Sequence, residues 1–295
     1  MRASIGCVPI VWNNVDVPDF APLAPWNEIL DTFARLGYQG TQFGRGFPEG
    51  DALRAELEKR DLRLAELYSA LPSGPDGLDP GAGAVARTDL GRLVAADGEV
   101  LVVALDGTEE CEAVAGRLGN APPRWPDGAF DELAALLAQI VEAAPDGVRV
   151  AFHPHTATWI ESPAEVAALA ARLPATSTGL CLDVGHYLVG GGDPVAALRE
   201  YGDLVTHVHA KDVDPAVLAR LRGGELSGFG EAVRERLFTE LGNGALDLAG
   251  IVRELNVIGF DGWIMVEQDS TWLAPAEAAA IGRRVLDYAI EKTRG

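Results

Sequence analysis

Short apolar runs alternate with amphipathic segments along almost the whole chain. The runs are rich in Val, Ile and Leu, and several have no polar position, which is typical of strands buried on both faces. They predict strands at 3–9, 37–43, 62–71, 99–107, 147–155, 178–183, 204–209 and 259–269. Segments with a 3.6-residue apolar period predict helices between them. These lie at 26–36, 51–60, 87–96, 129–144, 163–173, from 194 onward, 247–257 and 275–292, with a partly helical insertion at 216–241.

The alternation of strands and helices predicts the fold class. A helical segment between two strands makes the connection a crossover, so the strands lie parallel. Eight such units in 295 residues predict an α/β fold, the (β/α)8 TIM barrel. A doubly wound open sheet is the alternative, but no G-x-G-x-x-G motif follows the first strand. No repeat or linker interrupts the chain, so residues 1–295 are expected to form a single TIM-barrel domain.

Composition narrows the range of partners. The formal net charge of −20 argues against a nucleic-acid groove and against an anionic membrane surface. The first residues are not expected to form a signal peptide, and no apolar run is long enough to span a bilayer. Cys7, Cys111 and Cys181 are expected to be buried, reduced thiols, which favours a cytoplasmic protein. The sequence leaves the oligomeric state open, including a homo-oligomer.

Polar side chains gather at the ends of the last four predicted strands. All five histidines lie between His153 and His209. The carboxyl ends of barrel strands converge, so one side chain from each of four strands could surround one divalent ion. The alternative is four unrelated, solvated strand ends. Mixed nitrogen and oxygen ligands favour Mn or Co, with Zn, Fe, Ni and, less well suited, Mg as further choices. The residues concerned are His153, His155, Asp183, His186, His207, His209, Lys211, Glu267 and Asp269.

Several segments resemble a known family. They are AFHPHTATWIES (151–162), GLCLDVGHYLVGGGDPVAALREYGD (179–203), THVHAKDVDPAVLARLR (206–222), LGNGALDL (241–248) and GFDGWIMVEQD (259–269). They resemble the xylose-isomerase-like TIM barrels of the sugar isomerase and epimerase superfamily, and within it the inosose dehydratases. The resemblance runs nearly end to end. It implies an enzyme with one divalent metal ion held by residues on the last four strands.

Carried over by position, the resemblance implies that the metal ligands are His153, Asp183, His209 and Glu267. Epimerases of the superfamily usually have glutamate at the position of His153, whereas the dehydratase-like branch has histidine there. The dehydratases often have glutamate at the position of Gln42, so this chain departs from their pattern at that point.

These residues suit an enolisation. A ketone oxygen and a neighbouring hydroxyl bind the metal, which stabilises the enolate that forms when a base removes the α proton. Glu267 is the expected base as well as a ligand, and His186 and Lys211 are expected to deliver protons and contact substrate hydroxyls. The expected activity is that of a metal-dependent lyase that dehydrates a cyclic keto-polyol, as inosose dehydratases do. A keto-sugar or sugar-phosphate isomerase or epimerase that uses the same metal site is the alternative.

Two other classes are less well supported. A nuclease like the apurinic endonucleases can share this barrel, but it needs several zinc ions and a basic groove, whereas this chain is acidic. A catalytically inactive barrel retained for binding is the other, and four intact ligand positions argue against it.

Further residues are expected to contact a polyol or keto-sugar substrate. For His155, a contact that orients His153 is the alternative, and for Asn14 and Trp12 it is an ordinary surface loop. The expected substrate contacts are His155, Asn14, Trp12, Gln42 and Asp269.

The remaining polar and aromatic residues carry weaker signals. His207 lies one pleat deeper in its strand and is expected to be a buried, hydrogen-bonded histidine. Trp125 and Trp272 are expected either to close the mouth of the site or to pack against other side chains. Asp212 and Asp214 are expected on a solvated loop.

Overall fold

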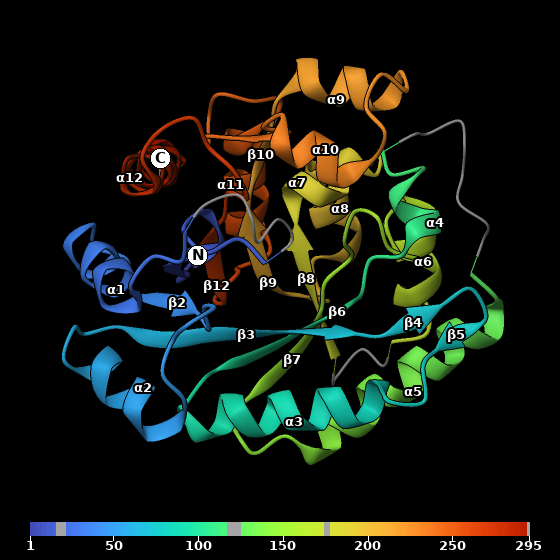
Figure 1. Cartoon of the computed structure of the whole chain (residues 1–295), viewed down its shortest axis with the longest axis horizontal. Coiled ribbons are helices and arrows are strands. Elements are labelled where there is room, and N and C mark those ends of the chain that lie inside the picture. Colours follow the sequence, from blue (N-terminus) through green and yellow to red (C-terminus); the bar gives the residue numbers. More distant parts are fainter. Residues whose placement is uncertain (16–21, 117–124, 174–177, 294–295) are drawn as a thin grey trace.

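Eight parallel strands close into a barrel in the computed structural model of the chain (Figure 1). The structure describes residues 1–15, 22–116, 125–173 and 178–293. Around the barrel the order is β1-β12-β9-β8-β7-β6-β3-β2. The predicted (β/α)8 barrel is therefore confirmed. The strands are β1 (Ser4–Cys7), β2 (Gly40–Gln42), β3 (Arg63–Leu71), β6 (Val100–Leu105), β7 (Arg149–Phe152), β8 (Thr178–Asp183), β9 (Val205–Ala210) and β12 (Trp263–Val266).

Helices surround the barrel, and two short antiparallel ribbons lie outside it (Figure 1). The helices are α1 (Trp26–Arg35), α2 (Gly50–Glu58), α3 (Ala82–Ala95), α4 (Glu109–Glu112), α5 (Asp127–Ala143), α6 (Pro163–Ala170), α7 (Val184–Val189), α8 (Pro194–Tyr201), α9 (Pro215–Arg222), α10 (Phe229–Arg234), α11 (Leu248–Val257) and α12 (Pro275–Lys292), with a 3-10 turn at Pro9–Val11. The ribbons pair β4 (Ser73–Gly74) with β5 (Gly77–Leu78), and β10 (Asp212–Val213) with β11 (Phe238–Thr239).

The interior of the barrel changes from apolar to polar along its axis. Because side chains alternate along a strand, Cys181 and Asp183 share one face of β8, and His207 and His209 share one face of β9. Cys181 belongs to a small apolar cluster that includes Val102 and Met265. Asp183 and His209 are register partners at the carboxyl ends of their strands. The apolar cluster therefore lies below Asp183 on β8, while His207 places a polar side chain deeper in the barrel on β9.

Local capping explains why the chain turns where it does after β8. The Asp183 carboxylate accepts the backbone N–H of His186 at 2.8 Å and caps α7. The sequence predicted no helix between the strand at 178–183 and the helix from 194 onward, so α7 is a correction. Asp193 accepts the backbone N–H groups of Val195 and Ala196, and α8 begins at Pro194 as predicted.

Other element boundaries differ modestly from the prediction. Helix α3 begins at Ala82, before the predicted start at residue 87, because Ala82, Ala84 and Ala86 favour helix in this Gly- and Pro-rich segment. Strand β7 ends at Phe152, so His153 and His155 follow the strand. The sequence predicted no helix between 107 and 129, so α4 is a further correction. Residues 16–21 and 117–124, which fall between predicted elements, lie outside the described residues.

The insertion after β9 folds beside the polar end of the barrel. It contains α9, α10 and the β10–β11 ribbon, in line with the helical character predicted for it. Its side chains pack around Val213, Leu221 and Phe238 as a separate apolar cluster. The rings of Phe229 and Phe238 lie 5.8 and 5.0 Å from that of His186. The insertion therefore forms one apolar wall of the site.

The cysteines and the helix lengths agree with the composition of the chain. Cys7, Cys111 and Cys181 are free and buried, as predicted. Among the described residues, no helix is both long and apolar enough to cross a bilayer.

Candidate metal centre

The ends of β7, β8, β9 and β12 bring the four predicted ligands together. Oδ2 of Asp183 lies 3.6 Å from Nε2 of His153 and 3.8 Å from Nδ1 of His209. Nδ1 of His209 lies 2.6 Å from Oε2 of Glu267. Glu267 is 9 % exposed and the other three residues are each 1 % exposed. The four side chains thus form one buried cluster.

Four atoms of this cluster have no hydrogen-bond partner of good geometry within the described parts of the chain. They are Nδ1 of His153, Oδ2 of Asp183, Nδ1 of His209 and Oε2 of Glu267. One ligand atom from each of Asp183, His209 and Glu267 lies within 4.8 Å of the other two. Buried polar atoms without partners are costly, and carboxylate oxygen with imidazole nitrogen is a donor set that Mn, Co and Zn accept. The residues therefore fit a divalent ion.

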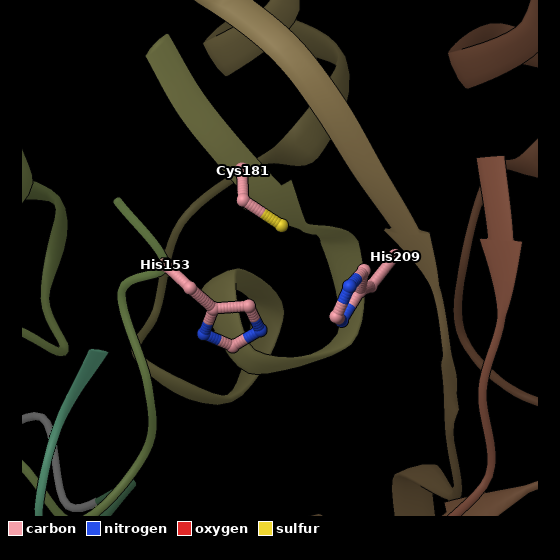
Figure 2. Close-up of side chains that lie close together, drawn as sticks. All are labelled: His153, Cys181 and His209. Atoms are coloured by element: carbon pink, nitrogen blue, oxygen red, sulfur yellow. The ribbon is translucent and has the colours of Figure 1, made fainter. Parts of the chain in front are cut away.

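A thiol lies beside the same cluster. Cys181 on β8 points toward the gap between His153 and His209 (Figure 2). Ligand atoms of these three residues also lie within 4.8 Å of one another, so Cys181 is a candidate ligand that the sequence analysis missed. Burial raises the pKa of this thiol to about 12, so it is protonated at neutral pH. The ionised carboxylates of Asp183 and Glu267 are the stronger donors.

Lys211 is a buried cation at the centre of several acidic groups. Its Nζ lies 2.8 Å from Oε1 of Glu267, 2.9 Å from Oδ1 of Asp269 and 3.6 Å from Oδ2 of Asp183. Burial alone would lower the pKa of Lys211, but these carboxylates raise it well above its usual value. Burial would likewise raise the pKa of Glu267, but Lys211 and His209 lower it well below the ordinary range. Both groups are therefore charged at neutral pH.

His186 links Lys211 to the loop after β7. Its Nε2 lies 3.0 Å from Nζ of Lys211, and its Nδ1 lies 2.7 Å from Oγ1 of Thr156. Burial, with His155 and Lys211 nearby, lowers the pKa of His186 well below its usual value. The neutral ring therefore accepts from the Lys211 ammonium at Nε2 and donates its Nδ1–H to Thr156.

Glu66 is a buried carboxylate that the sequence analysis did not single out. It lies in β3 and is fully buried. Its Oε2 accepts hydrogen bonds from Nε2 of His207 and, at 2.9 Å, from Nε2 of His209. Burial opposes its ionisation, but these two imidazoles lower its pKa to about 2. His207 is buried and hydrogen-bonded, as predicted.

The other predicted contacts lie in different surroundings. Asp269 is buried against Lys211, and the Asn14 amide donates to the backbone oxygen of Asp269 at 2.7 Å. The Trp12 ring packs edge-on against Phe33, with ring centroids 5.3 Å apart. Gln42 lies half-buried at the carboxyl end of β2.

Two tryptophans and two aspartates that the sequence singled out lie in well-defined surroundings. Trp125 is buried and donates to the backbone of Gly74, so it packs as one of the two expected alternatives. Trp272 is 77 % exposed, beneath the guanidinium of Arg236. The expectation of a solvated Asp212 was wrong: this residue is fully buried, because its carboxylate accepts four backbone N–H groups. Asp214 caps α9.

A pocket of about 300 Å³ adjoins the cluster through His155. Phe229 lines its apolar side, and Tyr68, Asp106 and Glu112 lie along its polar side. The Tyr68 ring lies 5.6 Å from that of His153, which connects the pocket with the four-residue cluster. Asp106 directly follows β6, so its place at the end of a strand was a signal that the sequence analysis did not use.

Comparison with known proteins gives relatives over nearly the full length. An inosose dehydratase of Lactiplantibacillus plantarum is 31% identical, over 95% of this chain and 94% of its own. The rhizopine catabolism protein MocC of Rhizobium meliloti is 32% identical, over 97% of this chain and 88% of its own.

Solved structures share the fold at low identity. An L-ribulose 3-epimerase superposes with a TM-score of 0.73 at 17% identity, over 99% of this chain and 96% of its own. An IolI protein with a bound zinc atom superposes with a TM-score of 0.68 at 16% identity, over 98% of this chain and 99% of its own. Residues 30–289 match the family described as the xylose isomerase-like TIM barrel. The chain belongs to this family and is an enzyme of its superfamily.

Proposed function

We propose that the protein is a metal-dependent hydro-lyase that removes water from a cyclic keto-polyol, as the inosose dehydratases do. The contact between Glu267 and Lys211 carries the proposal. A carboxylate and an ammonium lie 2.8 Å apart beside the four-residue cluster. An elimination needs one base and one acid, and this pair supplies both. The relative from L. plantarum, named as an inosose dehydratase, supports the same activity.

The proposed ligands are His153, Asp183, His209 and Glu267, with Mn or Co as the expected ion and Zn, Fe, Ni or Mg as alternatives. A divalent ion bound there supplies positive charge that stabilises the enolate of the substrate. The orphaned atoms of Asp183, His209 and Glu267 support this assignment. In this arrangement Oε2 of Glu267 faces the ligands and Oε1 faces Lys211.

Glu267 and Lys211 together supply the proton transfers of the elimination. Glu267 takes the proton from the carbon next to the ketone. Lys211 gives a proton to the hydroxyl on the following carbon, the C–O bond breaks, and water and an unsaturated ketone remain. The proton on Glu267 then returns to Lys211 across the 2.8 Å contact, which restores both groups. His186 holds Nζ of Lys211 in place throughout.

His153, the residue that follows β7, favours elimination over epimerisation. Epimerisation exchanges a proton between two faces of an enolate and is best served by a base on each side. His153 occupies the β7 side, and its Nε2 lies toward Oδ2 of Asp183. As a ligand it would be unavailable as the second base. A keto-sugar isomerase or epimerase on the same site is therefore the second candidate.

The proposed substrate-binding site is the pocket beside His155. Tyr68 and Asp106 are placed to contact ring hydroxyls, and His155 lies between the pocket and the cluster. Asp269, Asn14, Trp12 and Gln42 remain proposed as further residues of the substrate side. A single domain over 1–295 and a cytoplasmic location are part of the proposal, and the three free, buried cysteines support that location.

The proposed function is tested by identifying the products that the protein forms from a panel of candidate substrates. Protein reconstituted with Mn or Co is incubated with keto-inositols and ketohexoses, and the products are identified by mass spectrometry. Loss of one water from a keto-inositol is expected. A product of unchanged mass with altered chromatographic retention would replace the lyase with the isomerase candidate, and no product with any member of the panel would contradict both.

A further inference from the structure

Glu66 reaches the cluster from the opposite wall of the barrel. In the closed strand order, β3 and β9 are four strands apart in either direction. The side chain of Glu66 nevertheless lies within hydrogen-bond distance of both His207 and His209 on β9. All three side chains are at most 1 % exposed. A single carboxylate oxygen therefore joins the two walls through the middle of the barrel.

The two nitrogens of His209 face different groups. Nε2 lies 2.9 Å from Oε2 of Glu66, and Nδ1 faces Asp183 and Glu267. A neutral imidazole carries one proton, on one of its two nitrogens. A carboxylate can only accept, so a ring nitrogen that faces one carries a proton, at Nε2 beside Glu66 and at Nδ1 beside Glu267. An ion bound between Asp183, His209 and Glu267 would replace the proton on Nδ1, and the one remaining proton would stay on Nε2 against Glu66.

We propose that Glu66 is a positioning residue for the metal centre, whose carboxylate accepts the Nε2–H of His209 and so fixes the ring and the tautomer that present Nδ1 to the ion. The inference rests on the proposed metal centre and adds a residue to it. A carboxylate behind a ligating imidazole also makes that ligand more basic and strengthens its bond to the metal.

A second ion among Glu66, His207 and His209 is the competing interpretation, because their ligand atoms also lie close together. The hydrogen bonds disfavour it. Oε2 of Glu66 already accepts from Nε2 of both imidazoles. In contrast, Oδ2 of Asp183, Nδ1 of His209 and Oε2 of Glu267 have no hydrogen-bond partner of good geometry among the described residues.

A purely structural role for Glu66 is the other interpretation. An apolar side chain of similar volume would fill the barrel without the cost of burying a carboxylate. The matched control is Ser69, also buried in β3, whose hydroxyl donates to Asp89 at 2.9 Å. Ser69→Ala removes a buried polar contact from the same strand and leaves His209 untouched.

The experiment measures Zn affinity by competition with a chromophoric chelator, for native protein, Glu66→Gln and Ser69→Ala. Glu66→Gln is expected to weaken binding roughly 10- to 100-fold, while Ser69→Ala changes it by no more than about twofold. In Zn-loaded protein labelled with ¹⁵N-histidine, the Nε2–H signal of His209 is expected to be slow to exchange, and Glu66→Gln is expected to shift it and speed its exchange. A purely structural role would not move that signal.

The outcomes separate this inference from the metal centre itself. Native protein that binds one ion, with Glu66→Gln binding equally well, overturns the role of Glu66 and leaves the metal centre intact. Two ions per native chain support the competing second site and overturn the inference. Native protein that binds no ion contradicts the metal centre, and the inference falls with it. If Glu66→Gln does not fold, Glu66→Asp is used in its place, because it keeps the charge but withdraws the carboxylate from His209. Glu66→Asp is expected to show the same loss of Zn affinity and the same change in the His209 signal, and the absence of both would overturn the inference.

Discussion

Nζ of Lys211 lies 2.8 Å from Oε1 of Glu267, and the lysine side chain is 1 % exposed. A buried ammonium is stable only when charged or polar partners surround it. Here Glu267, Asp269 and His186 lie within 3.0 Å of Nζ. The proton on Lys211 is therefore held beside the residue that is proposed to take a proton from the substrate.

Replacing Lys211 tests its proposed role as the acid that protonates the departing hydroxyl. Lys211→Met is expected to slow loss of water by about 10²–10⁴-fold, because no group then protonates the departing hydroxyl. It is also expected to destabilise the fold by about 3–5 kcal/mol, since two buried carboxylates lose their cation. Single-turnover rates and denaturant unfolding measure these effects. Lys59→Met, at an exposed pair with Glu56, is the control and should change neither.

Replacing Glu267 tests the base. Glu267→Gln keeps the shape and one oxygen ligand, so it is expected to retain much of the metal. The elimination rate is expected to fall by at least the roughly 10²–10⁴-fold typical of a general base, and further because metal affinity also suffers. Metal content and single-turnover rates are measured on the same sample. Elimination at the native rate in this variant would remove Glu267 from the role of base.

Two changes at Asp183 separate its roles. The carboxylate caps α7 through Oδ1, and Oδ2 faces the proposed ion. Asp183→Asn preserves the cap but weakens metal binding, because the charge is lost. Asp183→Ala is expected to abolish binding and to cost a further ~1 kcal/mol of stability through loss of the cap. Calorimetric metal titration and denaturant unfolding resolve the two effects, and equal metal affinity in all three proteins would refute the ligand assignment.

The thiol of Cys181 offers a test between the two possible ligand sets. Because Asp183 and Glu267 are ionised while the thiol is protonated, Cys181→Ser is expected to change Co affinity by less than about tenfold, a change of less than ~1.4 kcal/mol. The visible spectrum of the Co-loaded native protein should lack an intense sulfur-to-metal charge-transfer band. Such a band, lost in Cys181→Ser, would make the thiol a ligand.

The low pKa of Glu66 predicts how stability depends on pH in the metal-free protein. The pKa is about 2 in the fold, against an ordinary value of 4.5. A carboxyl group whose pKa is lowered by folding stabilises the fold at pH values above its pKa in the unfolded state. This stabilisation is lost as the pH falls toward its pKa in the folded state. The difference in unfolding free energy between native protein and Glu66→Gln is therefore expected to narrow by roughly 3 kcal/mol between pH 4.5 and 2. A difference that stays constant over that range would contradict the ionised Glu66.

The strand ends could be predicted from the sequence because their chemistry is local. Asp183 and Glu267 directly follow apolar runs, and alternation along β9 places His207 and His209 on one face. Barrel closure then brings these ends together. The four predicted ligands consequently lie in one cluster.

Glu66 could not be found in the same way. It is a lone carboxylate inside an apolar strand, and its partners His207 and His209 lie 141 and 143 residues away along the chain. Only the closed barrel places β3 opposite β9. The prediction that Asp212 is solvated was wrong for the same reason, since its partners are distant in the sequence. Three of the backbone N–H groups that donate to its carboxylate belong to residues 242–246.

The most direct test of the proposed elimination is the reaction of Mn-loaded native protein with a keto-inositol in deuterated water, followed by mass spectrometry. A product that has lost one water is expected from the native protein. Neither this product nor proton exchange is expected from Glu267→Gln or from chelator-treated protein. Deuterium in recovered substrate or in an epimer, with no loss of water, would contradict the proposed elimination.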